Sequence, residues 1–351
     1  MAKAAGVSRT TVSFVLNGVQ NQGISAATRA KVLAVAKEMG YQPNAAARSL
    51  VSGSTGTVAL VIPKASHLAV DAFLAQLVAT LNEACHQQGL KLLIESTDEE
   101  GREPGGFMKL VHQRRIDGLI MANPRTTEHA HLDRIQAAGI PLVVLTSRPS
   151  ELPHLFTVLS DTSASARTAV QHLIGLGHRD IAFVSFAPPE FESVHERELG
   201  WREALRQAGL SVNESLLAYA DISAQSGYEA TQRLLAQGPP FTALFAGNDT
   251  IAIGALRALK EAGLRVPQDV SVMGYDDIPI AAFADPPLTT MRSDPVGQAQ
   301  AALKLLLAQF KGAPEGSDEV LNLQRQVHPE LVTRQSCAPL TPRKTQKPLA
   351  T

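Results

Sequence analysis

The sequence predicts a small all-α N-terminal unit followed by an α/β core with parallel sheets arranged in two lobes. The N-terminal segment contains short helical stretches with cap residues and glycine turns. From Thr57 onward, apolar runs of strand length alternate with helical stretches, the pattern of parallel sheets with right-handed crossovers. Several of these helical stretches end at a glycine, which is the usual signal for a helix C-terminus.

Charge is unevenly distributed along the chain. Over all 351 residues, 32 basic and 33 acidic side chains leave a net charge of −1. Up to Thr57, six basic residues face Glu38 alone and give +5, so the remaining 26 basic and 32 acidic residues give −6. The six are Lys3, Arg9, Arg29, Lys31, Lys37 and Arg48. Such a basic unit indicates a polyanion partner such as nucleic acid, with a solvated helix face as the simpler alternative.

The composition excludes several other classes of protein. Two distant cysteines, Cys85 and Cys337, rule out a disulfide scaffold or a cysteine-ligated zinc module and fit a reducing cytoplasm. Neither a membrane-spanning apolar run nor a signal sequence is present, so we expect a cytoplasmic protein that has no membrane partner. The tail at 334–351, rich in proline and lysine, is predicted to be poorly ordered.

Cap residues define a helix-turn-helix near the N-terminus. A first helix stops at Gly6, and Ser8 can cap a second helix that runs to about Leu16. Ser25 can cap a third helix that ends at about Met39. Two short helices around a tight turn form this DNA-binding motif. The inward face of the third helix is predicted from Val32, Leu33, Val35 and Ala36.

The first turn of the middle helix carries Arg9, Thr10 and Thr11. A cation at a helix N-terminus is disfavoured by about 0.3–1 kcal/mol because of the helix dipole. Arg9 is therefore easier to explain if it meets an anion or a base edge, since arginine pairs with guanine and threonine with bases or phosphates. An exposed arginine tolerated at small cost is the alternative, and local sequence alone leaves both open.

Three ordered motifs resemble the DNA-reading region of the LacI/GalR family of transcription regulators. They are AAGVSRTTVSFVLN at 4–17, ISAATR at 24–29 and GYQPNAAARSL at 40–50. The resemblance extends to about residue 335 and implies a periplasmic-binding-protein-like effector core. By position, it implies base-edge contacts from Arg9, Thr10 and Phe14. It also implies phosphate or supporting contacts from Ser8, Thr11, Ser13 and Asn17, and further DNA contacts from Tyr41, Asn44, Ala47 and Arg48.

Two positions of the DNA-reading region have more than one interpretation. Phe14 stands where the family often has a basic or polar residue, and it either touches a thymine methyl or packs inward. Residues 44–50 resemble the family's hinge helix, begun by Pro43 and favoured by three alanines. In the family, a leucine of this helix wedges into the minor groove, which implies that role for Leu50. The alternative places Leu50 in the effector-domain core.

The resemblance also sets the expected domain boundaries. We expect a helix-turn-helix headpiece at 1–43, a hinge helix and linker at 44–56, an effector-binding and dimerisation domain at 57–333, and the tail at 334–351. Family members usually have several residues before the position of Met1, so the first helix is expected to be truncated by a translation start assigned too late.

The core is predicted to contain two similar α/β lobes. We expect the chain to cross between the lobes near residues 160, 290 and 321, with a ligand held at the carboxyl ends of the strands. Predicted strands are 58–62, 90–95, 118–121, 141–145, 181–185, 243–246 and 270–274. Predicted helices are 72–88, 128–138, 164–176, 196–208, 224–236 and 250–262.

Four residues match effector-binding positions of the family: Arg197, Asp276, Asn248 and Ile222. Arginine and aspartate can bracket hydroxyls or carboxylates with charge-assisted hydrogen bonds. The alternative for this pair is a structural ion pair with Glu196, Glu198 or Arg292. Ile222 replaces an aromatic residue that often stacks on a sugar or base, and Thr146-Ser147 stands where many members have an aspartate. Phe186, Phe191 or Trp201 could supply an aromatic surface instead, although core packing is favoured for Trp201.

These features predict an effector-responsive, sequence-specific DNA-binding regulator, most simply a repressor of a catabolic or transport operon. We expect a homodimer on a pseudo-palindromic double-stranded DNA operator, because one headpiece reads one half-site. The expected effector is a sugar or related metabolite, with no cofactor, no metal and no catalytic residue. A transport-type solute-binding protein is the main alternative, and an enzyme that uses the cleft is a weaker one.

Overall fold

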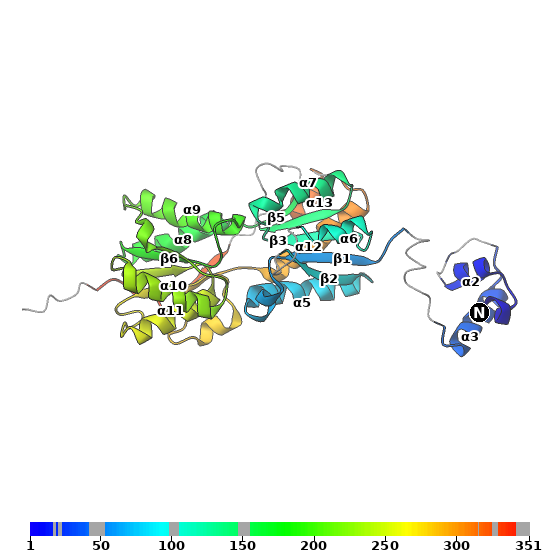
Figure 1. Ribbon diagram of the computed structural model, residues 1–351, viewed down its shortest axis with the longest axis horizontal. Coiled ribbons are helices and arrows are strands. Elements are labelled where there is room, and N and C mark those ends of the chain that lie inside the picture. The colour runs from blue at the N-terminus through cyan, green and yellow to red at the C-terminus, as the bar shows by residue number, and fades with distance from the viewer. Residues whose placement is uncertain are drawn as a thin grey trace, which may run out of the picture.

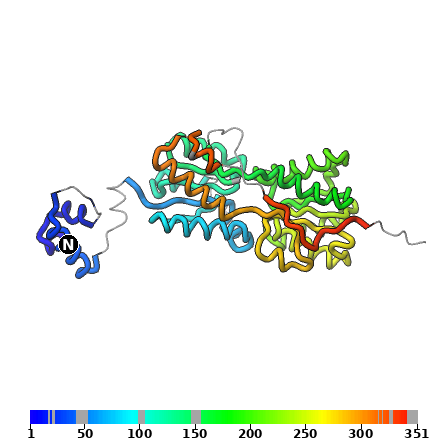
Figure 2. The backbone as a smooth tube through the Cα atoms, turned by 180° about the vertical axis from the view of Figure 1, so that it is seen from behind, coloured from blue at the N-terminus to red at the C-terminus, as the bar shows by residue number. Residues whose placement is uncertain are grey.

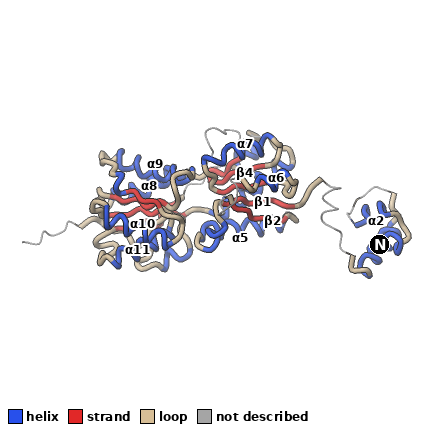
Figure 3. The backbone as a smooth tube through the Cα atoms, in the orientation of Figure 1, coloured by secondary structure: helices blue, strands red, loops and turns tan. Residues whose placement is uncertain are grey.

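The computed structural model describes residues 1–16, 19, 23–41, 53–97, 105–146, 155–314, 316–324 and 329–341 (Figure 1). It contains a small helical N-terminal unit and two α/β lobes. In each lobe the strands form a central sheet with helices on both faces (Figure 3). The predicted fold class, an all-α unit followed by a two-lobed core with parallel sheets, is confirmed.

The N-terminal unit contains α1 (Ala2–Ala5), α2 (Arg9–Leu16) and α3 (Ala26–Glu38). Both predicted N-caps are confirmed, because Ser8 Oγ accepts the Thr11 amide at 3.0 Å and Ser25 Oγ accepts the Thr28 amide at 3.1 Å. The small core comprises Ala5, Val12, Val15 and Val32. Leu33, which was predicted to face inward, is 49% exposed. Val32 and Ala36, one helical turn apart, form the buried face, and Leu33 lies about 100° around the helix from Val32.

The first lobe contains a five-stranded parallel sheet in the order β2-β1-β3-β4-β5. The strands are β1 (Thr57–Ile62), β2 (Lys91–Ser96), β3 (Gly118–Ala122), β4 (Leu142–Thr146) and β5 (Phe156–Leu159). One face packs on α5 and α12, and the other on α6 and α7. These helices are α5 (Ala72–Gln87), α6 (Met108–His112), α7 (His129–Ala137) and α12 (Pro295–Phe310), with α13 (Asp318–Leu323) beside α12 and short 3₁₀ turns η1 (Ala65–Ala69) and η2 (Thr126–Glu128).

The second lobe contains a four-stranded parallel sheet in the order β7-β6-β8-β9. The strands are β6 (Ile181–Ser185), β7 (Leu217–Tyr219), β8 (Ala243–Ala246) and β9 (Ser271–Met273). One face packs on α8 and α9 around the buried Trp201, and the other on α10 and α11. The helices are α8 (Thr162–Gly175), α9 (Glu192–Gln207), α10 (Ala224–Gln237) and α11 (Asp249–Glu261), with 3₁₀ turns η3 (Glu214–Leu216) and η4 (Pro279–Phe283).

The chain passes between the lobes at more than one place. It leaves the first lobe after β5 and enters α8 of the second lobe at Thr162. It returns after β10 (Thr290–Arg292) into α12, and β11 (Glu330–Val332), which follows α13, pairs antiparallel with β10. Figure 2 shows α12 in orange within one lobe and the last described segment in red along the other. The carboxyl ends of both parallel sheets therefore meet the segments that join the lobes.

The C-terminal segment differs from its predicted disorder. Ser336 is fully buried: its Oγ donates to the carbonyl of Val272 at 2.6 Å, and its own carbonyl accepts the Val272 amide at 2.8 Å. The Ala338 amide donates to Ser271 Oγ at 3.1 Å, and His178 Nε2 lies 3.1 Å from the Ala338 carbonyl. The prediction of disorder is therefore wrong for 334–341, because composition does not reveal backbone pairing with the distant strand β9. Residues 342–351 lie outside the described residues.

Helices α10 and α11 of the second lobe pack closely at Gly254. A Cβ atom on Gly254 of α11 would lie 2.0 Å from the carbonyl oxygen of Ala224 on α10. We expect Gly254→Ala to lower the free energy of unfolding by about 1–3 kcal/mol, because the two helix backbones must separate. Gly175→Ala in α8 is the matched control, since nothing lies within 4 Å of its added Cβ. Urea denaturation of both variants measures the difference, and equal stability would contradict this packing.

Candidate functional site

The first turn of α2 forms an exposed polar surface on the N-terminal unit. Arg9 and Thr10 are exposed, and the first turn contains no acidic residue. Among the described residues, no ion pair holds Arg9. Ser8 and Thr11 cap the helix together, since their side-chain oxygens lie 2.9 Å apart. The turn therefore presents Arg9 and Thr10 to solvent on a rigid, capped helix end.

The other predicted DNA-contacting residues have different settings. Ser13 and Phe14 on α2 are half-buried, so Phe14 is both partly packed and partly accessible. Tyr41, directly after α3, is exposed. Five predicted residues lie outside the described part of the chain: Asn17, Asn44, Ala47, Arg48 and Leu50.

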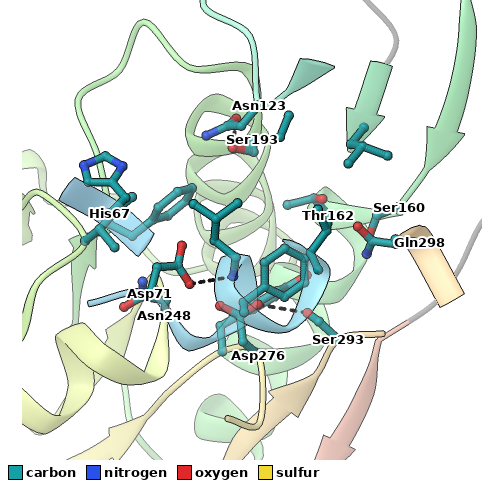
Figure 4. Close-up of a pocket in the computed structure, with 18 of the residues that line it drawn as sticks. His67, Asp71, Asn123, Ser160, Thr162, Ser193, Asn248, Asp276, Ser293 and Gln298 are labelled. Atoms are coloured by element: carbon teal, nitrogen blue, oxygen red, sulfur yellow. Dashed lines mark hydrogen bonds between the residues drawn. The ribbon is translucent and has the colours of Figure 1, made fainter. Parts of the chain in front are cut away.

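A cavity lies between the two lobes at the carboxyl ends of the strands (Figure 4). The space between its lining residues is about 790 Å³, which includes the open solvent at its mouth. All four predicted effector-contacting residues line it. Its polar lining consists of His67, Asp71, Asn123, Ser160, Thr162, Ser193, Arg197, Asn248, Tyr275, Asp276, Ser293 and Gln298.

Arg197 on α9 has its guanidinium group fixed between two aromatic rings. Its Cζ atom lies 3.9 Å from the centre of the Tyr275 ring and 4.4 Å from that of Phe186, close enough for cation–π attraction. Nη1 donates to the carbonyl of Gly247, and Nη2 lies 3.9 Å from Asp276 Oδ1. Nε is buried and has no hydrogen-bond partner among the described residues. The guanidinium group of Arg197 is therefore held in one orientation, and its Nε–H is a hydrogen-bond donor without a partner among the described residues.

Asp276 lies opposite Arg197, where its backbone has a φ of 107°, in the region that favours glycine. Ser293 Oγ donates to Asp276 Oδ1 at 2.9 Å, and the Asp276 amide donates to the carbonyl of Met291 at 2.7 Å. Burial raises the pKa of this carboxyl, and the charge of Arg197 opposes the rise. Asp276 therefore connects the cavity to the segment that runs from β10 into α12.

None of the described ion pairs joins Arg197 or Asp276 to Glu196, Glu198 or Arg292. Glu198 pairs with Arg202 at 2.6 Å, and Arg292 pairs with Asp277 at 2.8 Å. The carboxylate nearest to Arg197 among the described ion pairs is Asp276 itself. The Arg197–Asp276 pair therefore faces the cavity rather than a separate structural network.

Asn248 and Ile222 have clear backbone roles beside the cavity. Asn248 caps α11, because its Oδ1 accepts the Ile251 amide at 2.8 Å. Ile222 has a φ of 57°, which is strained for a β-branched residue, and its amide donates to the carbonyl of Phe186 at 2.7 Å. Both side chains are buried and line the cavity.

The aromatic candidates separate into three environments. Phe186 lines the cavity beneath Arg197. Phe191 packs under the guanidinium group of Arg125, whose Cζ atom lies 4.7 Å from the ring centre. Trp201 belongs to the core, as favoured, with its Nε1 donating to the carbonyl of Ile181 at 3.1 Å. The side chain of Thr146 and all of Ser147 lie outside the described part of the structure.

Sequence reasoning missed three important cavity residues. Asp71 caps α5, with its Oδ1 accepting the Leu74 amide at 3.1 Å, so an aspartate before a helix was an available signal. Asn123 directly follows β3, at the strand end where ligands are expected. Gln298 on α12 is buried, and its Oε1 has no hydrogen-bond partner among the described residues. No sequence signal marks Gln298, because its place depends on how α12 returns to the first lobe.

Polar contacts join the two lobes at the rim of the cavity. Lys64 Nζ lies 2.9 Å from Asp221 Oδ2, and His67 Nε2 lies 3.3 Å from Asp221 Oδ1. Ser193 on α9 donates to Asn123 after β3. Residues of the first lobe thus contact residues of the second, and the cavity is held in a closed arrangement.

Other kinds of site are not found in the described part of the chain. No group of three His, Cys, Asp or Glu residues there could hold a metal ion. None of the helices described is long and apolar enough to span a membrane.

The chain therefore combines a helical unit whose capped helix exposes Arg9 and Thr10 with a two-lobed fold that encloses a polar cavity. These features define the class of ligand-responsive DNA-binding proteins. Residues 1–44 match the family of bacterial regulatory proteins described as lacI family, and residues 170–337 match the periplasmic binding protein-like domain. The chain belongs to the lacI family and is a DNA-binding transcriptional regulator, not an enzyme.

Relatives and solved structures match nearly the whole chain. It is 32% identical over 338 residues to the HTH-type transcriptional repressor PurR of Salmonella newport (strain SL254), which covers 96% of both proteins. The lac repressor dimer bound to operator and the anti-inducer ONPF has 30% identity and a TM-score of 0.80, covering 96% of this chain and 97% of that chain. The transcriptional regulator CelR–cellobiose complex has 32% identity and a TM-score of 0.71, covering 95% and 98%.

Proposed function

We propose that this protein is a cytoplasmic repressor of a catabolic or transport operon that binds a pseudo-palindromic operator as a homodimer and responds to a small effector. The observation that carries the proposal is the presence, in one chain, of the exposed first turn of α2 and the closed cavity around Arg197 and Asp276. The relatives whose names describe repressors, an operator complex and a cellobiose complex support it.

On the operator, Arg9 and Thr10 read base edges in the major groove, because they project from the first turn of a helix that fits that groove. Ser8, Thr11, Ser13 and Asn17 support or contact the phosphates. The half-buried Phe14 touches a thymine methyl. Tyr41, Asn44, Ala47 and Arg48 add contacts around the hinge, and Leu50 enters the minor groove.

In the cavity, Arg197 and Asp276 bracket the effector, and Asn248 and Ile222 form the adjoining wall. Effector binding changes operator affinity to the extent that the effector prefers one arrangement of the lobes. Asp276 supplies a path for this coupling, because it bonds to Ser293 in the segment that joins β10 to α12. A ligand that shifts Asp276 would therefore also shift Ser293 and the segment that connects the lobes.

Binding to the protein's own upstream DNA tests the proposed function. Fluorescence anisotropy with that region should show tight binding that an unrelated duplex of equal length does not compete away. The logarithm of the affinity should fall linearly with the logarithm of salt, with a slope of about −0.9 per neutralised phosphate. A full-length protein that binds a small ligand but no upstream DNA would instead be a solute-binding protein of the transport type.

The dimer is proposed to use an exposed apolar surface on the second lobe. Phe283 is 84% exposed and Ile280, on the same 3₁₀ turn η4, is 56% exposed. We propose these two residues as part of the contact, because burial against a second subunit would remove their apolar surface from water. We expect Phe283→Asp to convert the dimer to monomer, because association would desolvate the new charge.

Analytical ultracentrifugation measures this shift, with an expected rise of at least 100-fold in the dimer dissociation constant. Leu321→Asp is the control: Leu321 is 54% exposed but lies on α13 in the other lobe. Equal dimer constants for wild type and Phe283→Asp would assign the interface to another surface.

A further inference from the structure

The cavity between the lobes is lined by more acidic groups than permanently charged basic groups. Of the described residues that line it, two are acidic, Asp71 and Asp276, and Arg197 is the one that carries a permanent positive charge. His67 is the other basic residue in this lining, and burial lowers its pKa, which favours the neutral form. The guanidinium group of Arg197 already donates to the carbonyl of Gly247 and lies beside the carboxyl group of Asp276. The lining therefore presents a ligand with two carboxyl groups and one guanidinium group.

The carboxyl group of Asp71 is held by backbone amides at the start of α5 and forms no ion pair among the described residues. Its Oδ1 accepts the Leu74 amide at 3.1 Å, and the group extends from the start of α5 into the cavity (Figure 4). Burial and the charge of Asp276 raise the pKa of Asp71 to about 6, while the charge of Arg197 lowers it. At neutral pH the group is mostly ionised, so it accepts hydrogen bonds and repels anions.

Two other polar side chains of the lining each have a buried atom without a hydrogen-bond partner. Gln298 Oε1 is an acceptor without a partner, and Arg197 Nε is a donor without a partner, among the described residues. Figure 4 shows Asp71 and Gln298 on opposite sides of the cavity. A buried polar atom without a partner is unfavourable, and a ligand with hydroxyl groups can supply the missing hydrogen bond.

We propose that Asp71 determines the specificity of the cavity, which admits a small hydroxylated or aminated molecule without negative charge and excludes its phosphorylated or carboxylated counterparts. This inference rests on the proposed function of the cavity as the effector site. A hydroxyl or amine donates to the Asp71 carboxylate, whereas a phosphate or carboxylate places a like charge beside it. In a water-poor site, that repulsion is larger than at an exposed surface.

Matched ligand sets test the proposal on the full-length protein. The probes are glucose, galactose, ribose, cellobiose and guanosine, each with its available amino, phosphate and acid counterparts, measured by isothermal titration calorimetry. We expect at least one uncharged or amino compound to bind and its phosphate or acid counterpart to bind at least 100-fold more weakly. Asp71→Asn should narrow this ratio to below 10-fold.

The pH dependence of binding separates a direct contact from a structural role. Ligand donors require ionised Asp71, so affinity should fall as the pH is lowered from 7 to 5. The charged groups that face Asp71 are Asp276 and Arg197, and Asp71→Asn should remove the part of the pH dependence that Asp71 contributes. Asp294→Asn is the control, because Asp294 caps α12 through the Gly297 amide in the same way but does not line the cavity.

Three results would overturn the inference. They are an anionic probe that binds as tightly as its uncharged counterpart, an Asp71→Asn variant with an unchanged ratio and pH profile, and no binding by any probe. Operator binding by the wild-type protein is measured in parallel. If the wild-type protein binds its operator but does not discriminate between anionic and uncharged probes, this inference alone is overturned. If the wild-type protein does not bind an operator, the proposed function is overturned.

Discussion

Replacing Arg197 with alanine is expected to weaken effector binding by at least 100-fold. The guanidinium group is held between the rings of Tyr275 and Phe186, so its remaining donor is already oriented when a ligand arrives. Hydrogen bonds to charged groups contribute about 1.5–3 kcal/mol, and a bidentate pair contributes more. The substitution also leaves Asp276 and Asp71 without their nearby cation, which adds to the loss.

Isothermal titration calorimetry with the compound that binds the wild-type cavity measures the change. The matched control is Arg202→Ala, because Arg202 lies on the same helix but pairs with Glu198 and Glu214 outside the cavity. Arg197→Lys should recover little affinity, since an ammonium group lacks the planar set of donors. An Arg197→Ala variant that binds within three-fold of wild type would place the effector elsewhere.

Replacing Arg9 with alanine is expected to lower operator affinity by about 5- to 150-fold, equivalent to about 1–3 kcal/mol for a good bidentate base contact. Arg9 projects from the first turn of α2, a position that the helix dipole disfavours for a cation without an anionic or base partner. The loss should be larger for the operator than for unrelated DNA, because unrelated DNA is held through phosphates.

Fluorescence anisotropy at several salt concentrations distinguishes the two contacts that remain open for Arg9. A base contact leaves the salt slope nearly unchanged and relaxes specificity at one position, whereas a phosphate contact lowers the slope by about 1. Lys37→Ala is the control, since Lys37 is an exposed cation in the last turn of α3. Equal operator affinity for wild type and Arg9→Ala would show that α2 does not read the operator through this residue.

Local features of this fold could be predicted because their causes lie within a few residues. The caps at Ser8 and Ser25 are confirmed, since each satisfies an amide three residues along the chain. Side-chain periodicity and glycines at helix ends also depend on neighbouring residues, so the alternation of strands and helices could be recognised. This alternation predicts the parallel sheets that the structure contains. Leu33 was placed wrongly because periodicity alone does not specify which side of a short helix meets its neighbours.

Residues from distant parts of the chain line the cavity, and local sequence pattern does not predict which of them come together. The family resemblance named Arg197, Asp276, Asn248 and Ile222, and all four line one cavity, while their proposed contacts with an effector remain to be measured. Gln298 lines the cavity because α12 returns to the first lobe. Residues 334–341 are ordered because they pair with β9, more than sixty residues earlier in the chain.

The sequence by itself determined that a basic helical unit precedes a larger acidic α/β core, because charge and periodicity are properties of the chain. Only the tertiary structure decided the charge of the cavity. Asp71 comes from the start of α5, Arg197 from α9 and Asp276 from the loop after β9, and folding places two acids beside one guanidinium group. The charges of these three groups depend on the distances between them and on their burial, which the sequence alone does not specify.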